Sequence, residues 1–143
     1  MAQGRKAPKV TCPCCKKPRS IDATPLLQQE EELRRKNADP HRRAEGWSVE
    51  VAQTGRLQWA CNLCLKNGKA IKANPAIQTF CDWEPYFAYF DVELRCEDCQ
   101  QQFVFSPKEQ QFWYENLKFW VQSRPKQCVS CRRARRQTKE GQP

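Results

Sequence analysis

Histidine is almost absent from this chain of 143 residues, in which His41 is the only one. A catalytic zinc site keeps one open position and usually takes histidine or carboxylate ligands together with a general base. His41 lies beside Arg42 and Arg43, apart from every cysteine pair, and we interpret it as a surface residue. The sequence also has no glycine-rich phosphate loop and no Ser/His/Asp arrangement. We therefore expect that the protein is not an enzyme.

Long apolar runs are absent as well. No run approaches the roughly 18 residues that a membrane span needs, and residues 1–6 lack the apolar stretch of a secretory signal. We expect a cytoplasmic protein without membrane contact. Disulfides do not persist in a reducing compartment, so metal is the expected fate of paired thiols there, and a secreted five-disulfide protein is the alternative. Only 39% of the residues are hydrophobic, so the expected core is small. Bound metal can stabilise a fold whose core is small.

Cysteine, by contrast, is abundant, with ten residues in the chain. Eight of them form four Cys-x-x-Cys pairs, numbered here 1 to 4 in chain order: Cys12/Cys15, Cys61/Cys64, Cys96/Cys99 and Cys128/Cys131. A structural zinc ion takes four ligands at about 2.3 Å, and each pair supplies two thiolates. The sequence therefore predicts two zinc ions.

The spacing favours one grouping of the pairs and leaves others open. Pairs 3 and 4 are separated by 28 residues and pairs 1 and 2 by 45, and we expect these two sequential sites. Alternatively, pairs 2 and 3 form one site and the terminal pairs another, or the pairs interleave as a cross-brace. Cys14 can replace Cys12 or Cys15 as a ligand, and Cys81 is expected to be a small buried apolar side chain.

The first half of the chain predicts one helix and one hairpin. Thr24 and Pro25 suit a helix start, and the predicted helix covers residues 25–38. Its apolar stripe is narrow and its Glu30–Glu32 run is expected to be solvated, so the helix should pack lightly or project. Residues 46–60 read as a hairpin. Residues 57–65 and 92–100 are similar in sequence. Each is expected to form a strand followed by a cysteine-bearing turn, or knuckle, whose backbone N–H groups point at the sulfur atoms.

The second half predicts a packed helix. Ser106-Pro107-Lys108-Glu109 forms a capping box, and the predicted helix covers residues 107–122. Five apolar residues at helical spacing are expected to form its buried face: Phe112, Trp113, Leu117, Trp120 and Val121. The aromatic residues between Phe80 and Phe90 are expected to belong to the core, with a base-stacking platform as the alternative.

The chain is basic, with a formal net charge of +9. Eight bound thiolates and two divalent ions bring the metal-bound form to about +5, which still favours polyanionic partners. The candidate polyanion-binding residues are Lys16, Lys17, Arg19, Arg132, Arg133, Arg135 and Arg136. Guanidinium groups pair well with phosphate, and a solvated tail is the other interpretation of the arginine run.

Residues 91–133 resemble a family of bacterial proteins, the probable zinc-ribbon domains. The similarity lies in Cys96-Glu97-Asp98-Cys99, in Phe103-Val104-Phe105, and in Pro125 ahead of Cys128-x-x-Cys131-Arg132. It implies zinc at these four cysteines, and the upstream segment resembles a weaker second ribbon. Members often carry glycine where this chain has Gln100, so the knuckle geometry is expected to be slightly altered.

Together these observations predict a small α+β protein with two zinc-ribbon-like four-cysteine modules of short hairpins. The expected parts are a disordered N-terminus (1–11), a first zinc module with a helical insertion (12–80), a second module (81–133) and a basic tail (134–143). The expected function is that of a structural zinc protein, an adaptor for nucleic acid or an acidic protein. The alternative is a rubredoxin-like iron or dithiol redox protein.

Overall fold

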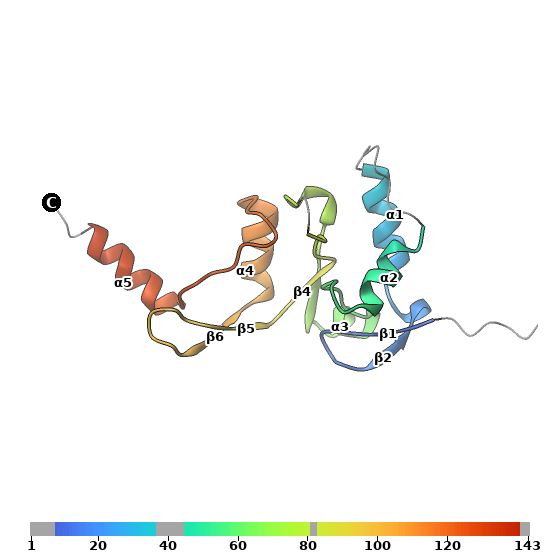
Figure 1. Cartoon of the computed structure of the whole chain (residues 1–143), viewed down its shortest axis with the longest axis horizontal. Coiled ribbons are helices and arrows are strands. Elements are labelled where there is room, and N and C mark those ends of the chain that lie inside the picture. Colours follow the sequence, from blue (N-terminus) through green and yellow to red (C-terminus); the bar gives the residue numbers. More distant parts are fainter. Residues whose placement is uncertain (1–7, 37–44, 81–82, 141–143) are drawn as a thin grey trace, which may run out of the picture.

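The computed structural model describes residues 8–36, 45–80 and 83–140, with side chains described through residue 138. His41 and Cys81 lie outside these ranges. The described chain is elongated, with the N-terminal hairpin near one end and the last helix at the other (Figure 1). Three two-stranded antiparallel sheets lie along it: β1–β2, β3–β4 and β5–β6.

The N-terminal part starts with a hairpin of β1 (Lys9–Thr11) and β2 (Pro18–Ser20), followed by the 3-10 turn η1 (Ile21–Ala23). Residues 9–11 were expected to lack fixed structure, and that expectation is wrong. Val10 is paired with Arg19 across the hairpin and is only 2% exposed. Burial of this side chain stabilises the strand, and the polar residues around it conceal that role in the sequence.

Helix α1 (Leu26–Lys36) begins where Thr24 and Pro25 predicted, but it does not project. Leu26 and Leu33 are buried in the core of this half, and so are Gln29 and Glu30. The Gln29 Nε2 group donates to the Phe87 carbonyl oxygen at 2.7 Å, which ties α1 to a segment 58 residues away. The narrow apolar stripe is thus widened by two polar residues that have buried partners.

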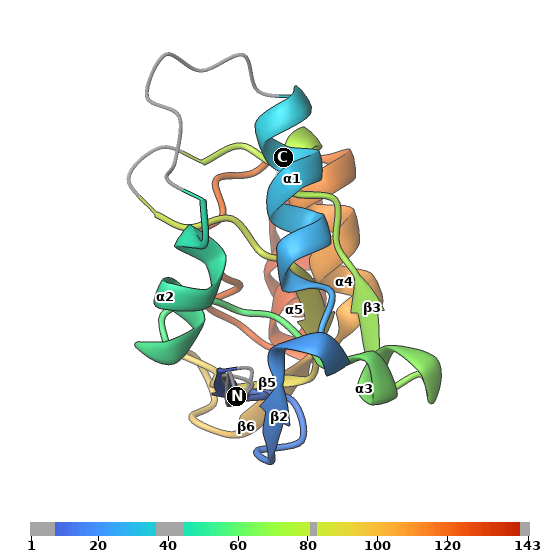
Figure 2. The same cartoon turned by 90° about the vertical axis from the view of Figure 1, so that its right-hand side faces the viewer.

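Helix α2 (Trp47–Gln53) occupies the segment where a hairpin was predicted. Its first turn lies against α1 (Figure 2), and the buried Glu30 accepts hydrogen bonds there from the N–H groups of Gly46 (3.1 Å) and Ser48 (2.6 Å). A carboxylate at a helix N-terminus satisfies free N–H groups and favours the helix dipole. The alternation of residues 47–51 is therefore overridden by a tertiary contact, and Glu30 is not part of a solvated face.

The centre of the molecule joins its two halves. Short helix α3 (Asn62–Lys66) leads into β3 (Ala70–Lys72), then the 3-10 turn η2 (Pro75–Ile77), and β3 pairs with β4 (Ala88–Phe90). Phe87 is fully buried in the N-terminal core, whereas Tyr89 stacks on Tyr114 in the C-terminal core. Most of the aromatic cluster is therefore core, as expected, and it connects the two halves.

The C-terminal part consists of the hairpin β5 (Val92–Arg95) and β6 (Gln102–Phe105), helix α4 (Pro107–Gln111), the π-helical turn η3 (Phe112–Asn116) and helix α5 (Val129–Glu140). Ser106 caps α4 as predicted, accepting from the Glu109 N–H at 3.3 Å. The helical segment ends far short of residue 122.

The predicted buried face of residues 107–122 is wrong in most positions. Gln110 and Tyr114 are each 1% exposed and face the core, whereas Phe112, Leu117 and Trp120 are between 44% and 51% exposed. A π turn has a longer period than an α-helix, so it rotates the following residues away from the 3.6-residue pattern. Val121 is buried as expected, but it lies beyond the helix.

The prediction of a small mixed protein with short antiparallel hairpins is confirmed. None of the helices in the described ranges is long and apolar enough to cross a membrane.

Candidate metal centres

The first centre brings cysteine pairs 1 and 2 together across 45 intervening residues. The Sγ atoms of Cys12, Cys15, Cys61 and Cys64 all lie within 4.8 Å of one another. Pair 1 lies in the knuckle between β1 and β2, whereas Cys61 is the N-cap of α3 and Cys64 lies within that helix. Three of these cysteines are buried and Cys15 is partly exposed.

The second centre combines pairs 3 and 4, again with all four sulfurs within 4.8 Å. Pair 3 lies in the knuckle between β5 and β6, and pair 4 lies at the start of α5. Cys96 is buried, whereas Cys99 is exposed. The structure therefore groups the pairs sequentially, and neither the cross-brace nor the pairing of the terminal knuckles occurs.

The two centres share one construction, in which a hairpin knuckle gives two ligands and a helix N-terminus gives the other two. In knuckle 1, the turn that carries Cys12 and Cys15, the Cys12 N–H donates to the Lys17 carbonyl (3.0 Å) and the Lys16 N–H donates to the Cys12 carbonyl (2.7 Å). Knuckle 2, the turn that carries Cys96 and Cys99, repeats this pattern: the Cys96 N–H donates to the Gln101 carbonyl (2.9 Å) and the Gln100 N–H donates to the Cys96 carbonyl (3.0 Å). The repeat proposed between residues 57–65 and 92–100 is wrong, because residues 57–60 form no strand and Cys61 begins a helix.

A left-handed residue closes each knuckle. Lys16 has φ of 63° and Gln100 has φ of 66°, a region that normally favours glycine. Gln100 was expected to alter the knuckle geometry slightly, and knuckle 1 has the same bond pattern around Lys16, which is also not glycine. The glutamine adopts the conformation that glycine would adopt and accepts its strain.

The spacing of the sulfurs fits a tetrahedral metal. Four ligands at about 2.3 Å from a zinc ion lie about 3.8 Å from one another. The observed Sγ···Sγ distances are 4.0 Å for Cys12 and Cys64, 3.9 Å for Cys15 and Cys61, 3.6 Å for Cys61 and Cys64, and 3.9 Å for Cys99 and Cys128. A disulfide would need about 2.05 Å. Four thiolates in this geometry match zinc or a single iron ion.

The thiols of the first centre are unequal. Desolvation opposes ionisation of Cys15, yet the backbone N–H of Lys17 and the Arg19 guanidinium lower its pKa to about 6. Burial raises the pKa of Cys12 and Cys64, and neighbouring sulfurs raise that of Cys64 further. Four thiolates repel one another at this distance, and a divalent cation removes that repulsion.

The second centre shows the same inequality. Desolvation works against the Cys96 thiolate, but the N–H groups of Cys99, Cys128 and Asp98 lower its pKa to about 6. Hydrogen bonding to the sulfurs of Cys128 and Cys96 raises the pKa of Cys131 to about 12. Against desolvation, hydrogen bonds also lower the pKa of Cys61, so the first centre has two thiols that ionise more readily than a free cysteine, and the second centre has Cys96.

Groups around the sulfurs hold and neutralise them. The Cys61 N–H points at Cys12 Sγ (3.3 Å) and the Cys99 N–H at Cys96 Sγ (3.4 Å), as predicted for zinc knuckles. Arg19 Nη2 lies 3.7 Å from Cys15 Sγ. A metal bound by four thiolates carries a net charge of −2, so Arg19 stabilises the loaded centre. This role was missed in the sequence, where Arg19 was taken for a polyanion-binding residue.

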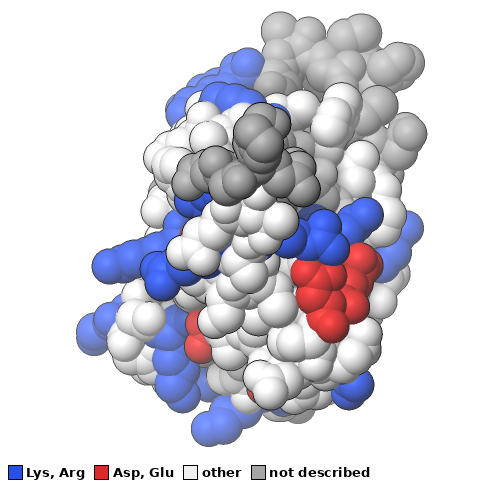
Figure 3. Space-filling model, turned by 90° about the vertical axis from the view of Figure 1, so that its left-hand side faces the viewer, with Lys and Arg blue, Asp and Glu red and all other residues white. Residues whose placement is uncertain are grey.

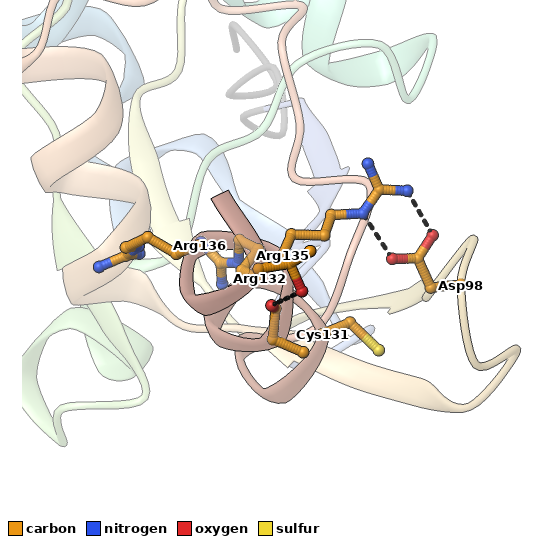
Figure 4. Close-up of a pocket in the computed structure, with 7 residues that line it drawn as sticks. Asp98, Cys131, Arg132, Arg135 and Arg136 are labelled. Atoms are coloured by element: carbon orange, nitrogen blue, oxygen red, sulfur yellow. Dashed lines mark hydrogen bonds and ion pairs between the residues drawn. The ribbon is translucent and has the colours of Figure 1, made fainter. Parts of the chain in front are cut away.

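Two of the predicted polyanion-binding arginines form ion pairs that attach helix α5. Arg135 donates to both carboxylate oxygens of Asp98 at 2.7 and 2.8 Å (Figure 4). Arg132 donates to Glu109 Oε1 at 2.8 Å, so the acidic residue of the predicted capping box binds an arginine. Residues from 134 onward were expected to form a basic tail, but residues 134–140 continue helix α5, which extends to Glu140. Because the acidic partners are 23 and 37 residues away in the sequence, no local pattern predicts these ion pairs.

The other candidates remain at the surface. Lys16, Lys17, Arg133 and Arg136 are exposed, and no ion pair is found for them among the described residues. Arg136 points away from Asp98 (Figure 4). Seen from the α5 end, Lys and Arg side chains are spread around the face, with a large acidic patch on the right and a smaller acidic area on the lower left (Figure 3). The two basic groups of the sequence belong to different halves of the molecule.

Cys14 is not one of the four clustered ligands. It lies in knuckle 1, partly exposed, and packs against the N-terminal core. Burial raises the pKa of its thiol. Cys12 and Cys15 therefore occupy the ligand positions that Cys14 was considered for.

No curated protein and no solved structure matches the chain in the comparisons. One family model matches its C-terminal part, and the matched segment contains the second centre with its hairpin and α5. This bears out the resemblance drawn from residues 91–133. The chain is thus a metal-binding protein with two four-cysteine centres, for which zinc fits the donor set, and its residues 90–140 match the family described as a probable treble clef domain.

Proposed function

We propose that the protein is a non-enzymatic adaptor of the cytoplasm, in which two structural zinc ions staple a small scaffold that binds nucleic acid. The observation that carries the proposal is the closed donor set of both centres: each has four cysteine sulfurs at tetrahedral spacing. Such a site offers no open position for a substrate or an activated water. Zinc would supply the fold's cohesion here, and the chain's own surface would do the binding.

The unpaired cations support a polyanionic partner. Arg133 and Arg136 are three residues apart on α5, so they lie on neighbouring positions of one helical face, whereas Arg132 and Arg135 are held by acids. Knuckle 1 adds Lys16 and Lys17. Phosphate contacts from such residues give affinity without sequence specificity.

Salt dependence tests this proposal. Fluorescence anisotropy measures the affinity of the metal-loaded protein for fluorescein-labelled single-stranded and duplex oligonucleotides. The measurement is repeated at KCl concentrations between about 50 and 300 mM, over which the affinity should fall by orders of magnitude. Each phosphate contact contributes about −0.9 to the slope of log K against log salt for a duplex and about −0.7 for a single strand. Replacing Arg133 and Arg136 by glutamine should make the slope of log K against log salt shallower by the amount that one or two phosphate contacts contribute. Arg35→Gln, on α1 at the other end of the molecule, is the matched control.

Two alternatives have distinct outcomes. If no oligonucleotide binds at low salt, the nucleic-acid proposal fails and an acidic protein partner takes its place. A red, redox-active protein would instead show iron in the same sulfurs, since closed zinc centres are colourless and slow to react with thiol reagents.

A further inference from the structure

The cleft between the two halves of the molecule has the composition of a nucleobase site. It is a surface hollow of about 630 Å³, within the range of small-molecule sites. Knuckle 1, the segment after α2, the segment before β4 and the residues between η3 and α5 all contribute to its lining. No single half of the chain therefore contains the whole cleft.

The floor of the cleft is apolar and fixed. Leu57 and Val121 are 2% and 1% exposed, and both line it. Tyr86 lies beside them, donating from its hydroxyl to the Val121 carbonyl and from its backbone N–H to Gln78 Oε1 at 2.8 Å. These bonds hold the floor in one arrangement before any ligand arrives, which lowers the entropy cost of binding.

Trp83 forms part of the wall and differs from the other aromatic residues of its segment. Phe87 and Tyr89 are fully buried, whereas Trp83 is 60% exposed. Tyr86, Tyr89 and Tyr114 contact one another's rings, but no ring contact of Trp83 is found within the described part of the chain. An exposed indole ring beside a cleft is a stacking surface, because every nucleobase has a π face.

The rim is positively charged. Lys16, Arg56 and Arg124 are exposed and line the cleft, and Glu84 is the acidic residue among its lining. Glu84 lies 3.7 Å from Arg56, so it offsets one cation and leaves Lys16 and Arg124 uncompensated. Phosphate groups of a nucleic acid are the kind of anion that such cations bind.

We propose that this cleft binds a nucleobase of a single-stranded nucleic acid, stacked on Trp83, with its flanking phosphates at Lys16 and Arg124. The inference rests on the proposed nucleic-acid-binding function and names its substrate class. Single strands are favoured over duplexes, because an unpaired base is free to enter the cleft, whereas a paired base must first be unstacked and unpaired. The same chemistry exists in a free nucleotide, which the test separates from a strand.

The experiment measures the affinity of the metal-loaded full chain for labelled oligo(dT) and oligo(rU) of about ten nucleotides by anisotropy. Trp83→Ala should weaken binding about 5- to 150-fold, the range of stacking on one aromatic side chain, and Trp83→Phe should restore most of it. Trp120→Ala is the matched control, because Trp120 is also about half exposed (48%) but lies outside this lining. Lys16→Gln and Arg124→Gln should each weaken binding and flatten the salt slope by about 0.7.

The remaining arms assign the ligand. Unlabelled single strand should displace the probe well below the concentration at which a nucleoside monophosphate does, and a duplex of the same sequence should lose the dependence on Trp83. Displacement by both at equal base concentration would overturn the single-strand assignment. Equal affinities for Trp83→Ala and Trp120→Ala would overturn the cleft while leaving nucleic-acid binding intact, whereas an absence of any binding would refute the proposed function itself. Metal content by native mass spectrometry and circular dichroism verify that each variant is folded.

Discussion

Helix α5 should depend on the second metal for its attachment to the rest of the molecule. The helix contributes Cys131 to the centre, and Cys128 directly precedes it. Within the described part of the chain, the ion pairs of Arg132 with Glu109 and of Arg135 with Asp98 also attach it. The perturbation is the double change Cys128→Ser and Cys131→Ser, which removes half of the ligands.

The magnitude follows from these attachments. Partly exposed ion pairs contribute about 1 kcal/mol or less each, so the two pairs together give at most about 2 kcal/mol. Ordering the backbone costs about 1 kcal/mol or more per residue, and an isolated helix of about 12 residues is marginal in water. A structural zinc ion contributes about 10 kcal/mol or more. Without the metal, docking of α5 should therefore be stabilised by 2 kcal/mol or less, and its amides protected by at most about 30-fold, since about 1.4 kcal/mol is a factor of ten.

Hydrogen exchange with mass spectrometry measures this protection on peptides covering residues 129–138, with native mass spectrometry counting the metals. We expect one metal lost and α5 exchanging almost freely, while α1 stays protected because its core lies in the other half. Cys14→Ser is the control, since Cys14 belongs to neither centre, and it should keep two metals and full protection. Unchanged protection of α5 in a protein that has lost one metal would refute the reasoning.

Three further predictions concern single side chains. Glu30→Gln should lower the free energy of unfolding by about 1–3 kcal/mol in urea titrations, because the buried carboxylate accepts two N–H groups at the start of α2, whereas exposed Glu31→Gln should change it little. Gln100→Gly should raise it by about 1 kcal/mol by relieving the left-handed strain, and a loss of stability would contradict this. Arg19→Ala should weaken metal retention at the first centre about 10- to 100-fold in chelator competition, because the cation beside Cys15 is lost; equal loss from both centres would argue against it.

Local signals in the sequence were reliable where the structure depends on neighbours along the chain. Thr24 and Pro25 mark the start of α1, Ser106 caps α4, and residues 92–105 form the expected hairpin. These features need only a few adjacent residues. The left-handed residue of a knuckle also follows from local geometry, but Lys16 and Gln100 conceal it because glycine is the usual sign.

Predictions failed where a distant residue decides the outcome. Residues 47–53 form a helix because Glu30 on another element supplies the cap, and the face of residues 107–122 is turned by a π-helical segment. Half of the arginine run is engaged by Asp98 and Glu109, which lie 37 and 23 residues away from their partners. None of these contacts leaves a periodic trace in the sequence.

The sequence by itself determined the metal chemistry, because four Cys-x-x-Cys pairs in a chain with one histidine leave thiolate as the available ligand. Only the tertiary structure decided how the pairs combine, since the packing of α3 against the first hairpin and of α5 against the second places the sulfurs within bonding reach of a common ion. It also decided which aromatic and cationic side chains stay at the surface. Spacing along the chain limits which ligands are possible, whereas burial and distant charge pairs determine which residues remain free to bind a partner.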